Sequence, residues 1–122
     1  MTVSVVIADD VEQMRDLLTR IFERDSRFEV VGAASDGEEA VALVEKLKPD
    51  VILLDLMMPN KSGLQASREI RELSPSTRIV ILSGVTSDTA IHALPADGVL
   101  EKGTPSVEIV ALVARLTSNE PI

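Results

Sequence analysis

The sequence predicts one α/β domain: a doubly wound, five-stranded parallel sheet with helices on both faces. Short apolar segments that suit buried strands alternate five times with segments whose apolar residues recur at helical spacing. Parallel strands joined through helices form right-handed crossovers, which place helices over the sheet. The length of 122 residues suits a single domain with its own core. We expect the domain to span residues 1–118, and the polar residues 119–122 to be a tail or the start of a linker.

The first strand is predicted at residues 3–8, a β-branched apolar run of the kind found in strands that are buried on both faces. Apolar residues at helical spacing follow over residues 11–22, and residues 28–33 are the second strand candidate. Asp36 is a suitable N-cap for the second helix. That helix should end before Pro49, because the residue before a proline disfavours helical geometry.

The third and fourth strands are predicted at residues 51–54 and 78–82. Between them, Ser62 and Gln65 match a capping box, in which each side chain accepts a hydrogen bond from the other residue's backbone N–H. The third helix is therefore expected to begin at this pair.

The last part of the chain predicts two helices and one strand. A short fourth helix is expected within residues 86–94, because Pro95 ends it. Residues 98–101 are a short fifth strand. Thr104 and Pro105 suit the N-cap and the first residue of the last helix.

The composition narrows the class of protein. The formal net charge is −8, whereas nucleic-acid binding depends largely on Lys and Arg that neutralise phosphates. This domain alone is therefore not expected to bind nucleic acid. No apolar run approaches the roughly 20 residues that span a bilayer, and the N-terminus lacks the features of a signal peptide. The absence of cysteine rules out disulfides and thiolate metal sites. We expect a cytoplasmic protein without membrane association.

Five side chains that could carry chemistry directly follow predicted strands. Asp9 and Asp10 follow the first strand, Asp55 the third, Ser83 the fourth and Lys102 the fifth. Ligands of such sheets bind outside the carboxyl ends of the strands, so these side chains should converge if their strands are neighbours. Each residue alone has a plainer explanation as a helix cap, a turn residue or a solvated charge. Their common placement is what indicates a site.

Three neighbouring carboxylates favour a bound cation, because packed like charges either raise one another's pKa or gather a positive ion. Carboxylate oxygens select a hard ion such as Mg²⁺ or Ca²⁺ rather than zinc. Mg²⁺ takes one or two carboxylates, keeps waters and accepts phosphate oxygens. With a lysine and a hydroxyl beside it, such a site is suited to phosphoryl groups. Asp55 could then be a nucleophile, because carboxylates form aspartyl phosphates.

The chain resembles the receiver domains of two-component response regulators over roughly residues 3–116. Its strongest local match is the spacing of Asp55, Pro59 and Gly63. The pattern is completed by Asp9-Asp10, Ser83-Gly84 and residues 97–102. The resemblance implies the CheY-like, flavodoxin-like fold, in which the strand order is 2-1-3-4-5.

The resemblance also implies a role for each acidic residue. Asp55 would accept a phosphoryl group from the phosphohistidine of a histidine kinase or a phosphotransfer protein. Asp9, Asp10 and Asp55 would hold Mg²⁺ together with the backbone carbonyl of Met57. Asp10 would be the direct ligand, and Asp9 would act directly or through water.

The resemblance also implies which residues respond to phosphorylation. Ser83 and Lys102 would contact the phosphoryl group and favour an activated conformation. Val99 stands where the family usually has Tyr or Phe, and Gly103 follows Lys102 where proline is common. The expected helix within residues 86–94 is also short, so we expect altered coupling to the signalling face. The Lys-Gly form occurs in some family members with DNA-binding domains, which favours a part in a transcriptional regulator.

Three alternatives remain at the level of sequence. An enzyme with an aspartyl nucleophile commonly has a second Asp two residues later, where this chain has Met57. A flavodoxin-like nucleotide binder would need a Gly- or hydroxyl-rich loop after the first strand, where this chain has Asp9 and Asp10. A receiver-like interaction module that is not phosphorylated would keep the fold. The intact acidic residues, Ser83 and Lys102 argue against it, whereas Val99 and the short expected helix leave it open. We expect no enzyme activity beyond the domain's own phosphorylation and dephosphorylation.

The expected partners follow from the receiver resemblance. They are the phosphodonor protein, an effector domain or a downstream protein, and a second copy of the chain on activation. The sequence fits either a stand-alone receiver or the front of a longer regulator.

Overall fold

The computed structural model of the chain describes residues 2–84 and 95–118. The short helix expected within residues 86–94 and the tail at residues 119–122 lie outside the described residues. No helix in the described part of the chain is long and apolar enough to cross a membrane.

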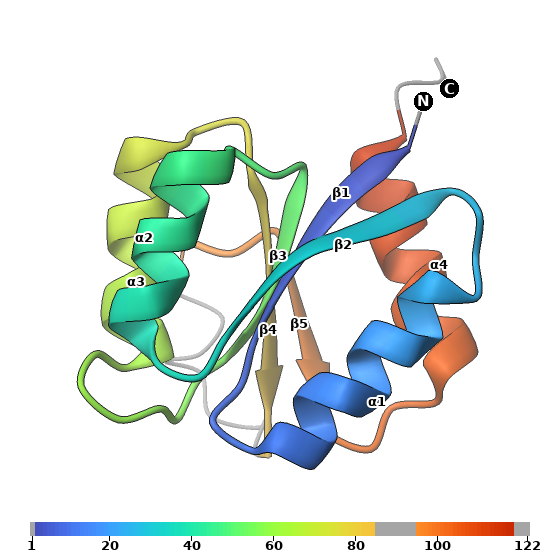
Figure 1. Cartoon of the computed structure of the whole chain (residues 1–122), viewed down its shortest axis with the longest axis horizontal. Helices are drawn as coiled ribbons and strands as arrows, with labels where there is room; N and C mark the ends of the chain where they lie inside the picture. The colour runs from blue at the N-terminus through green and yellow to red at the C-terminus, as the bar shows by residue number, and fades with distance from the viewer. Residues whose placement is uncertain (1, 85–94, 119–122) are drawn as a thin grey trace.

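The described residues form a five-stranded, wholly parallel sheet in the order β2-β1-β3-β4-β5 (Figure 1). The strands are β1 (Val3–Ala8), β2 (Phe28–Ala34), β3 (Val51–Asp55), β4 (Arg78–Ser83) and β5 (Gly98–Glu101). The helices are α1 (Glu12–Glu23), α2 (Gly37–Leu47), α3 (Gly63–Leu73) and α4 (Ser106–Thr117). The predicted fold class and strand order are therefore confirmed.

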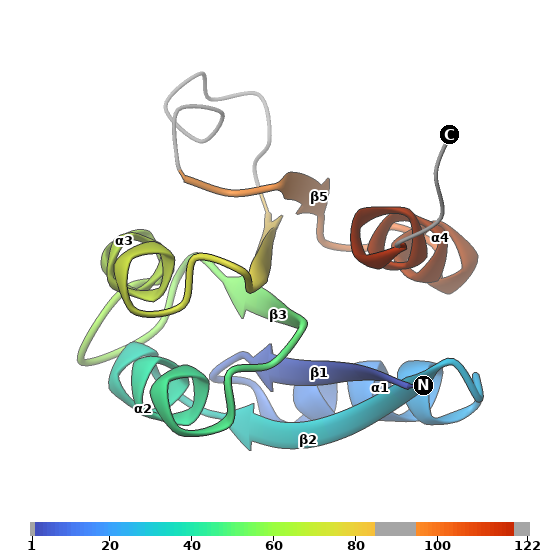
Figure 2. The same cartoon turned by 90° about the horizontal axis from the view of Figure 1, so that it is seen from above.

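The sheet separates two apolar cores. Helices α2 and α3 cover one face, and α1 and α4 cover the other, as the view from above shows (Figure 2). The central strand β3 is buried along its whole length, which matches its unbroken apolar sequence. In β3, Ile52 and Leu54 face the α2 and α3 side, whereas Val51 and Leu53 face α1 and α4. This strand is the rigid base from which Asp55 extends.

Two of the three predicted helix starts are confirmed. The Asp36 side chain accepts a hydrogen bond from the Glu39 backbone N–H over 2.8 Å, and Ser62 and Gln65 form the expected capping box. The predicted start of the last helix is wrong, because α4 begins at Ser106.

The true start of α4 follows from the turn after β5. Pro105 has a ψ angle of 142°, which is not helical, and Thr104 does not cap the helix. Its hydroxyl instead donates to the Glu101 carbonyl over 2.5 Å and closes a turn. Gly103, with a φ of 95°, allows that turn.

Candidate functional site

Strand register brings the predicted site residues to one edge of the sheet. Ala8 pairs with Leu54, so the residues that follow β1 lie beside Asp55. Asp55 itself pairs with Leu82 of β4, and Ser83 pairs with Glu101 of β5. The acidic residues, Ser83 and Lys102 thus sit at the carboxyl ends of four adjacent strands, the edge at which α/β sheets bind ligands.

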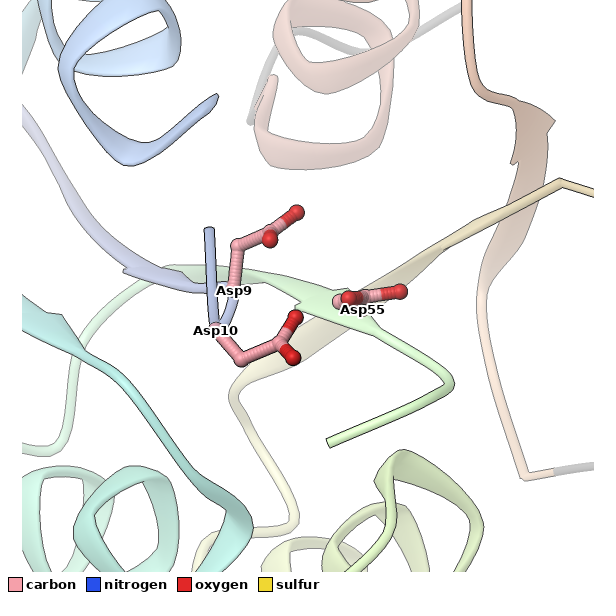
Figure 3. Close-up of side chains that lie close together, drawn as sticks. All are labelled: Asp9, Asp10 and Asp55. Atoms are coloured by element: carbon pink, nitrogen blue, oxygen red, sulfur yellow. The ribbon is translucent and has the colours of Figure 1, made fainter. Parts of the chain in front are cut away.

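Three carboxylates converge at this edge (Figure 3). Asp9, Asp10 and Asp55 each offer an oxygen atom, and these atoms all lie within 4.8 Å of one another. Asp9 is fully buried and Asp55 is 2% exposed, whereas Asp10 is exposed. We refer to these three residues as the acidic group. Two of its charges are therefore withdrawn from water, and the third lies at its solvent-facing side.

Lys102 supplies a positive charge to both buried carboxylates. Its Nζ lies 3.2 Å from Asp55 Oδ1 and 3.6 Å from Asp9 Oδ2. The backbone contributes as well, because the Val11 N–H donates to Asp9 Oδ1 over 2.9 Å and the Met57 N–H donates to Asp55 Oδ1 over 3.3 Å. Two buried oxygens, Asp9 Oδ2 and Asp55 Oδ2, still accept no hydrogen bond from the described residues.

The negative charges of the buried carboxylates exceed the positive charge beside them. Burial and then the neighbouring charge of Asp9 raise the pKa of Asp55 above its usual 3.8, despite the opposing effect of Lys102. Burial alone would lower the pKa of Lys102, but the hydrogen bond and charge of Asp55, with the charge of Asp9, raise it above 10.5. One lysine thus remains charged beside carboxylates whose negative charge it does not fully offset.

The acidic group fits a hard cation. A buried carboxylate oxygen without a hydrogen bond is costly, and a metal ion would give both such oxygens a partner. All the available ligand atoms are oxygens, which suit Mg²⁺ or Ca²⁺ rather than a soft metal. The group could therefore hold a metal ion, with Lys102 on one side and solvent on the other.

The structure places the remaining predicted residues around this group. Ser83 is buried at the end of β4, and its carbonyl accepts from the Lys102 N–H over 2.8 Å. A Cβ at Gly84 would meet no described atom within 4 Å. The Met57 side chain is 76% exposed on the loop after β3.

Arg15 is a neighbour of the site that the sequence reading missed. Its guanidinium donates to the backbone carbonyl of Asp9 over 2.7 Å and so ties α1 to the loop that carries two acidic residues. In the sequence it reads as one charge among several on an amphipathic helix. No motif in the sequence marks this contact.

Comparisons with known proteins agree with this geometry. Residues 5–114 match the family model of the response regulator receiver domain. A protein-glutamate methylesterase/protein-glutamine glutaminase from Photobacterium profundum is 44% identical over 79% of this chain and 24% of its own length. The transcriptional regulatory protein DegU of Brevibacillus brevis is 42% identical over 66% of this chain and 34% of its own length.

The solved structures include the signal receiver domain of the NarL response regulator from Mycobacterium tuberculosis. It is 30% identical and superposes with a TM-score of 0.90 over 98% of both chains. The chain thus spans about a quarter to a third of the two sequence relatives but the whole of this isolated receiver. It belongs to the receiver domain family of two-component response regulators.

Proposed function

We propose that Asp55 accepts a phosphoryl group, with Mg²⁺ held by Asp9, Asp10, Asp55 and the Met57 backbone carbonyl. The observation that carries this proposal is the pair of buried carboxylate oxygens without hydrogen bonds, set against Lys102. A structural cluster of charges would be expected to satisfy those oxygens internally, because unpaired buried polar groups are rare. A metal and a transferred phosphoryl group provide the missing partners.

The transfer step is a displacement at phosphorus. An oxygen of the Asp55 carboxylate attacks the phosphorus of a phosphohistidine, the new O–P bond forms as the P–N bond breaks, and the imidazole nitrogen keeps the electron pair. Mg²⁺, when bound, offsets the charge on the phosphoryl oxygens. Lys102 is already charged and in contact with Asp55, so it stabilises the same charge without moving far. The Ser83 hydroxyl donates to a phosphoryl oxygen.

Phosphorylation would then redistribute the contacts of Lys102 and Ser83. The phosphoryl group adds roughly two negative charges and three strong acceptors. Ser83 is the last residue of β4 and Lys102 directly follows β5, so the new contacts bias the position of these two strand ends. The domain itself is expected to perform no chemistry other than its own phosphorylation and dephosphorylation.

The partners belong to the same proposal. The phosphodonor is a histidine kinase or a phosphotransfer protein, and the output is an effector domain or a downstream protein. One relative is a methylesterase and another a transcriptional regulator. The same type of receiver thus occurs with two kinds of output, and a transcriptional one is proposed here.

The test is labelling of the purified chain with a small phosphodonor. Incubation with acetyl phosphate and Mg²⁺ should add one phosphoryl group, seen by intact-mass spectrometry, and chelation of Mg²⁺ should prevent it. Asp55→Asn should abolish the adduct, because an amide is not a nucleophile of this kind. Asp16→Asn, an equal charge change at an exposed position of α1, should leave it unchanged. Unchanged labelling of Asp55→Asn would reject Asp55 as the acceptor, whereas a wild-type chain that takes no label would favour the interaction module.

A further inference from the structure

We propose that Asp36 and Asn60 form a polar link that positions the β3–α3 loop, residues 56–62, for metal binding. Asp36 precedes α2, and Asn60 lies in the loop after the phosphoacceptor strand. Both would act as positioning residues, since neither belongs to the acidic group. The inference rests on the proposed function, because the loop reaches the metal through the Met57 carbonyl.

One carboxylate joins the two elements. The Asn60 side-chain amide donates to Asp36 Oδ2 over 2.7 Å. The other oxygen, Asp36 Oδ1, accepts from the Glu39 backbone N–H over 2.8 Å and caps α2. The hydrogen bonds from Glu39 and then Asn60 lower the pKa of Asp36 below 3.8, so the carboxylate is charged at neutral pH. The cap of α2 and the anchor of the loop are thus the same side chain.

The backbone of the loop meets α2 at the same place. Asn60 has a φ of 65°, a left-handed conformation that Asn adopts more readily than most residues. The Lys61 N–H donates across it to the Pro59 carbonyl over 2.7 Å. A Cβ at Gly37, the first residue of α2, would collide with the Lys61 carbonyl. The contact between helix and loop therefore requires glycine and is reinforced by the polar link.

Met57 depends on this anchorage because its side chain provides little and its own N–H makes a long hydrogen bond, 3.3 Å, to Asp55 Oδ1. That side chain is 76% exposed, so packing does not hold the residue in place. On the near side of the loop, the Gly63 N–H donates to the Leu56 carbonyl over 2.8 Å. On the far side, the link holds Asn60. The Met57 carbonyl lies between these two fixed points, and loss of either would widen the range of positions it occupies.

The expected effect is moderate, because the link is an exposed hydrogen bond. A hydrogen bond of this kind changes an equilibrium constant by roughly two- to tenfold. An apparent affinity falls by the fraction of molecules in the competent conformation. Removing the link should therefore weaken Mg²⁺ binding roughly two- to tenfold.

The deciding variant is Asn60→Gly. Glycine accepts the positive φ and keeps the net charge, so the amide is removed without backbone strain; the double substitution below separates this loss from the added freedom of glycine. Two measurements are needed without any phosphodonor: the Mg²⁺ dissociation constant by titration calorimetry, and hydrogen exchange of the Lys61 and Gly63 amides without metal. We expect a dissociation constant raised roughly two- to tenfold and faster exchange of both amides. Lys61→Gln removes the ion pair between this loop and Glu69 but keeps the link, and should not weaken Mg²⁺ binding.

A double substitution tests whether the contact itself matters. Asn60→Asp places two carboxylates against each other and should speed exchange of the loop amides. Adding Asp36→Asn restores an amide–carboxylate pair in the reverse sense, keeps a good N-cap and should restore the protection. Wild-type Mg²⁺ affinity in Asn60→Gly, or unchanged hydrogen exchange of the loop amides, would overturn the positioning role of the link while leaving the proposed function intact. A wild-type chain that binds no Mg²⁺ would overturn both.

Discussion

Asp55 is a residue whose burial opposes folding until it has a further partner. It is 2% exposed, one of its oxygens accepts no hydrogen bond from the described residues, and its pKa is raised by burial and by Asp9. The charged form is therefore less stable in the folded than in the unfolded chain. Sites that hold such unfavourable groups commonly trade stability for function.

Asp55→Asn should therefore stabilise the metal-free domain. Asparagine removes one of two adjacent buried charges and leaves Lys102 with Asp9. We expect the free energy of unfolding near pH 7 to rise by about 1–2 kcal/mol, the usual scale for an unsatisfied buried polar group. Urea denaturation in the presence of a chelator measures this change, with Asp16→Asn at an exposed position of α1 as the control.

The pH dependence of that difference has a definite sign. Because the pKa of Asp55 is higher in the folded than in the unfolded chain, wild-type stability falls as pH rises above 3.8 through the folded pKa. The variant lacks this loss. Its advantage should be small near pH 4 and grow towards neutrality, and an advantage that shrinks over that range would contradict the assignment.

At the scale of elements, β5 is held at its amino end by a polar cluster far from the acidic group. Asp97 accepts from the Arg71 guanidinium over 2.7 Å and from the Ile79 N–H over 2.8 Å. Arg71 also donates to the Pro95 carbonyl over 3.1 Å. These bonds join the last turn of α3, the start of β4 and the start of β5. The short strand that Lys102 follows is thus fixed at its other end.

Asp97→Asn should loosen this junction. Burial by itself would raise the pKa of Asp97, but the hydrogen bonds from Arg71 and Ile79 and the charge of Arg71 lower it below 3.8. Its contribution to stability is therefore present above pH 3.8 and is lost as pH falls through the lowered pKa. We expect the variant to be about 1–2 kcal/mol less stable near pH 7. The difference should narrow near pH 3.

The measurement is urea denaturation of both proteins at the two pH values. Glu72→Gln, an equal charge change at an exposed position of α3, is the matched control and should lie within about 0.5 kcal/mol of wild type. A penalty for Asp97→Asn that is the same at both pH values would show that the carboxylate charge is not what stabilises the junction.

Periodicity was sufficient to predict the helices and strands of the described residues, but not every helix terminus. The runs of β-branched residues located the described strands, and Ser62 and Gln65 located the start of α3, because both signals are local. The predicted helix cap at Thr104 is wrong because a threonine hydroxyl can either cap a helix or close a turn. The φ of 95° at Gly103 favours the turn. The spacing of residues along the sequence does not reveal that angle.

At the scale of the molecule, topology explains why the acidic group could be predicted and its supports could not. Residues that follow parallel strands must reach the same edge, so strand order alone brings Asp9 and Asp55 together. The links between Asp36 and Asn60 and between Arg71 and Asp97 join residues 24 and 26 positions apart. Such pairs depend on the packing of neighbouring helices and loops, which no repeat or motif in the sequence marks.

Mg²⁺ should stabilise the whole domain, because its proposed ligands come from the ends of two strands at the centre of the sheet. A ligand that binds only the folded state adds RT ln(1 + [L]/Kd), about 2.7 kcal/mol at a concentration of 100 Kd. The urea midpoint of the wild type should rise with the logarithm of Mg²⁺ concentration. NaCl at matched ionic strength separates binding from screening of the net charge of −8. Asp10→Asn and Asp55→Asn should respond less, so saturating Mg²⁺ should abolish or reverse the advantage of Asp55→Asn. An equal rise in all three proteins would mean that the acidic group is not the metal site.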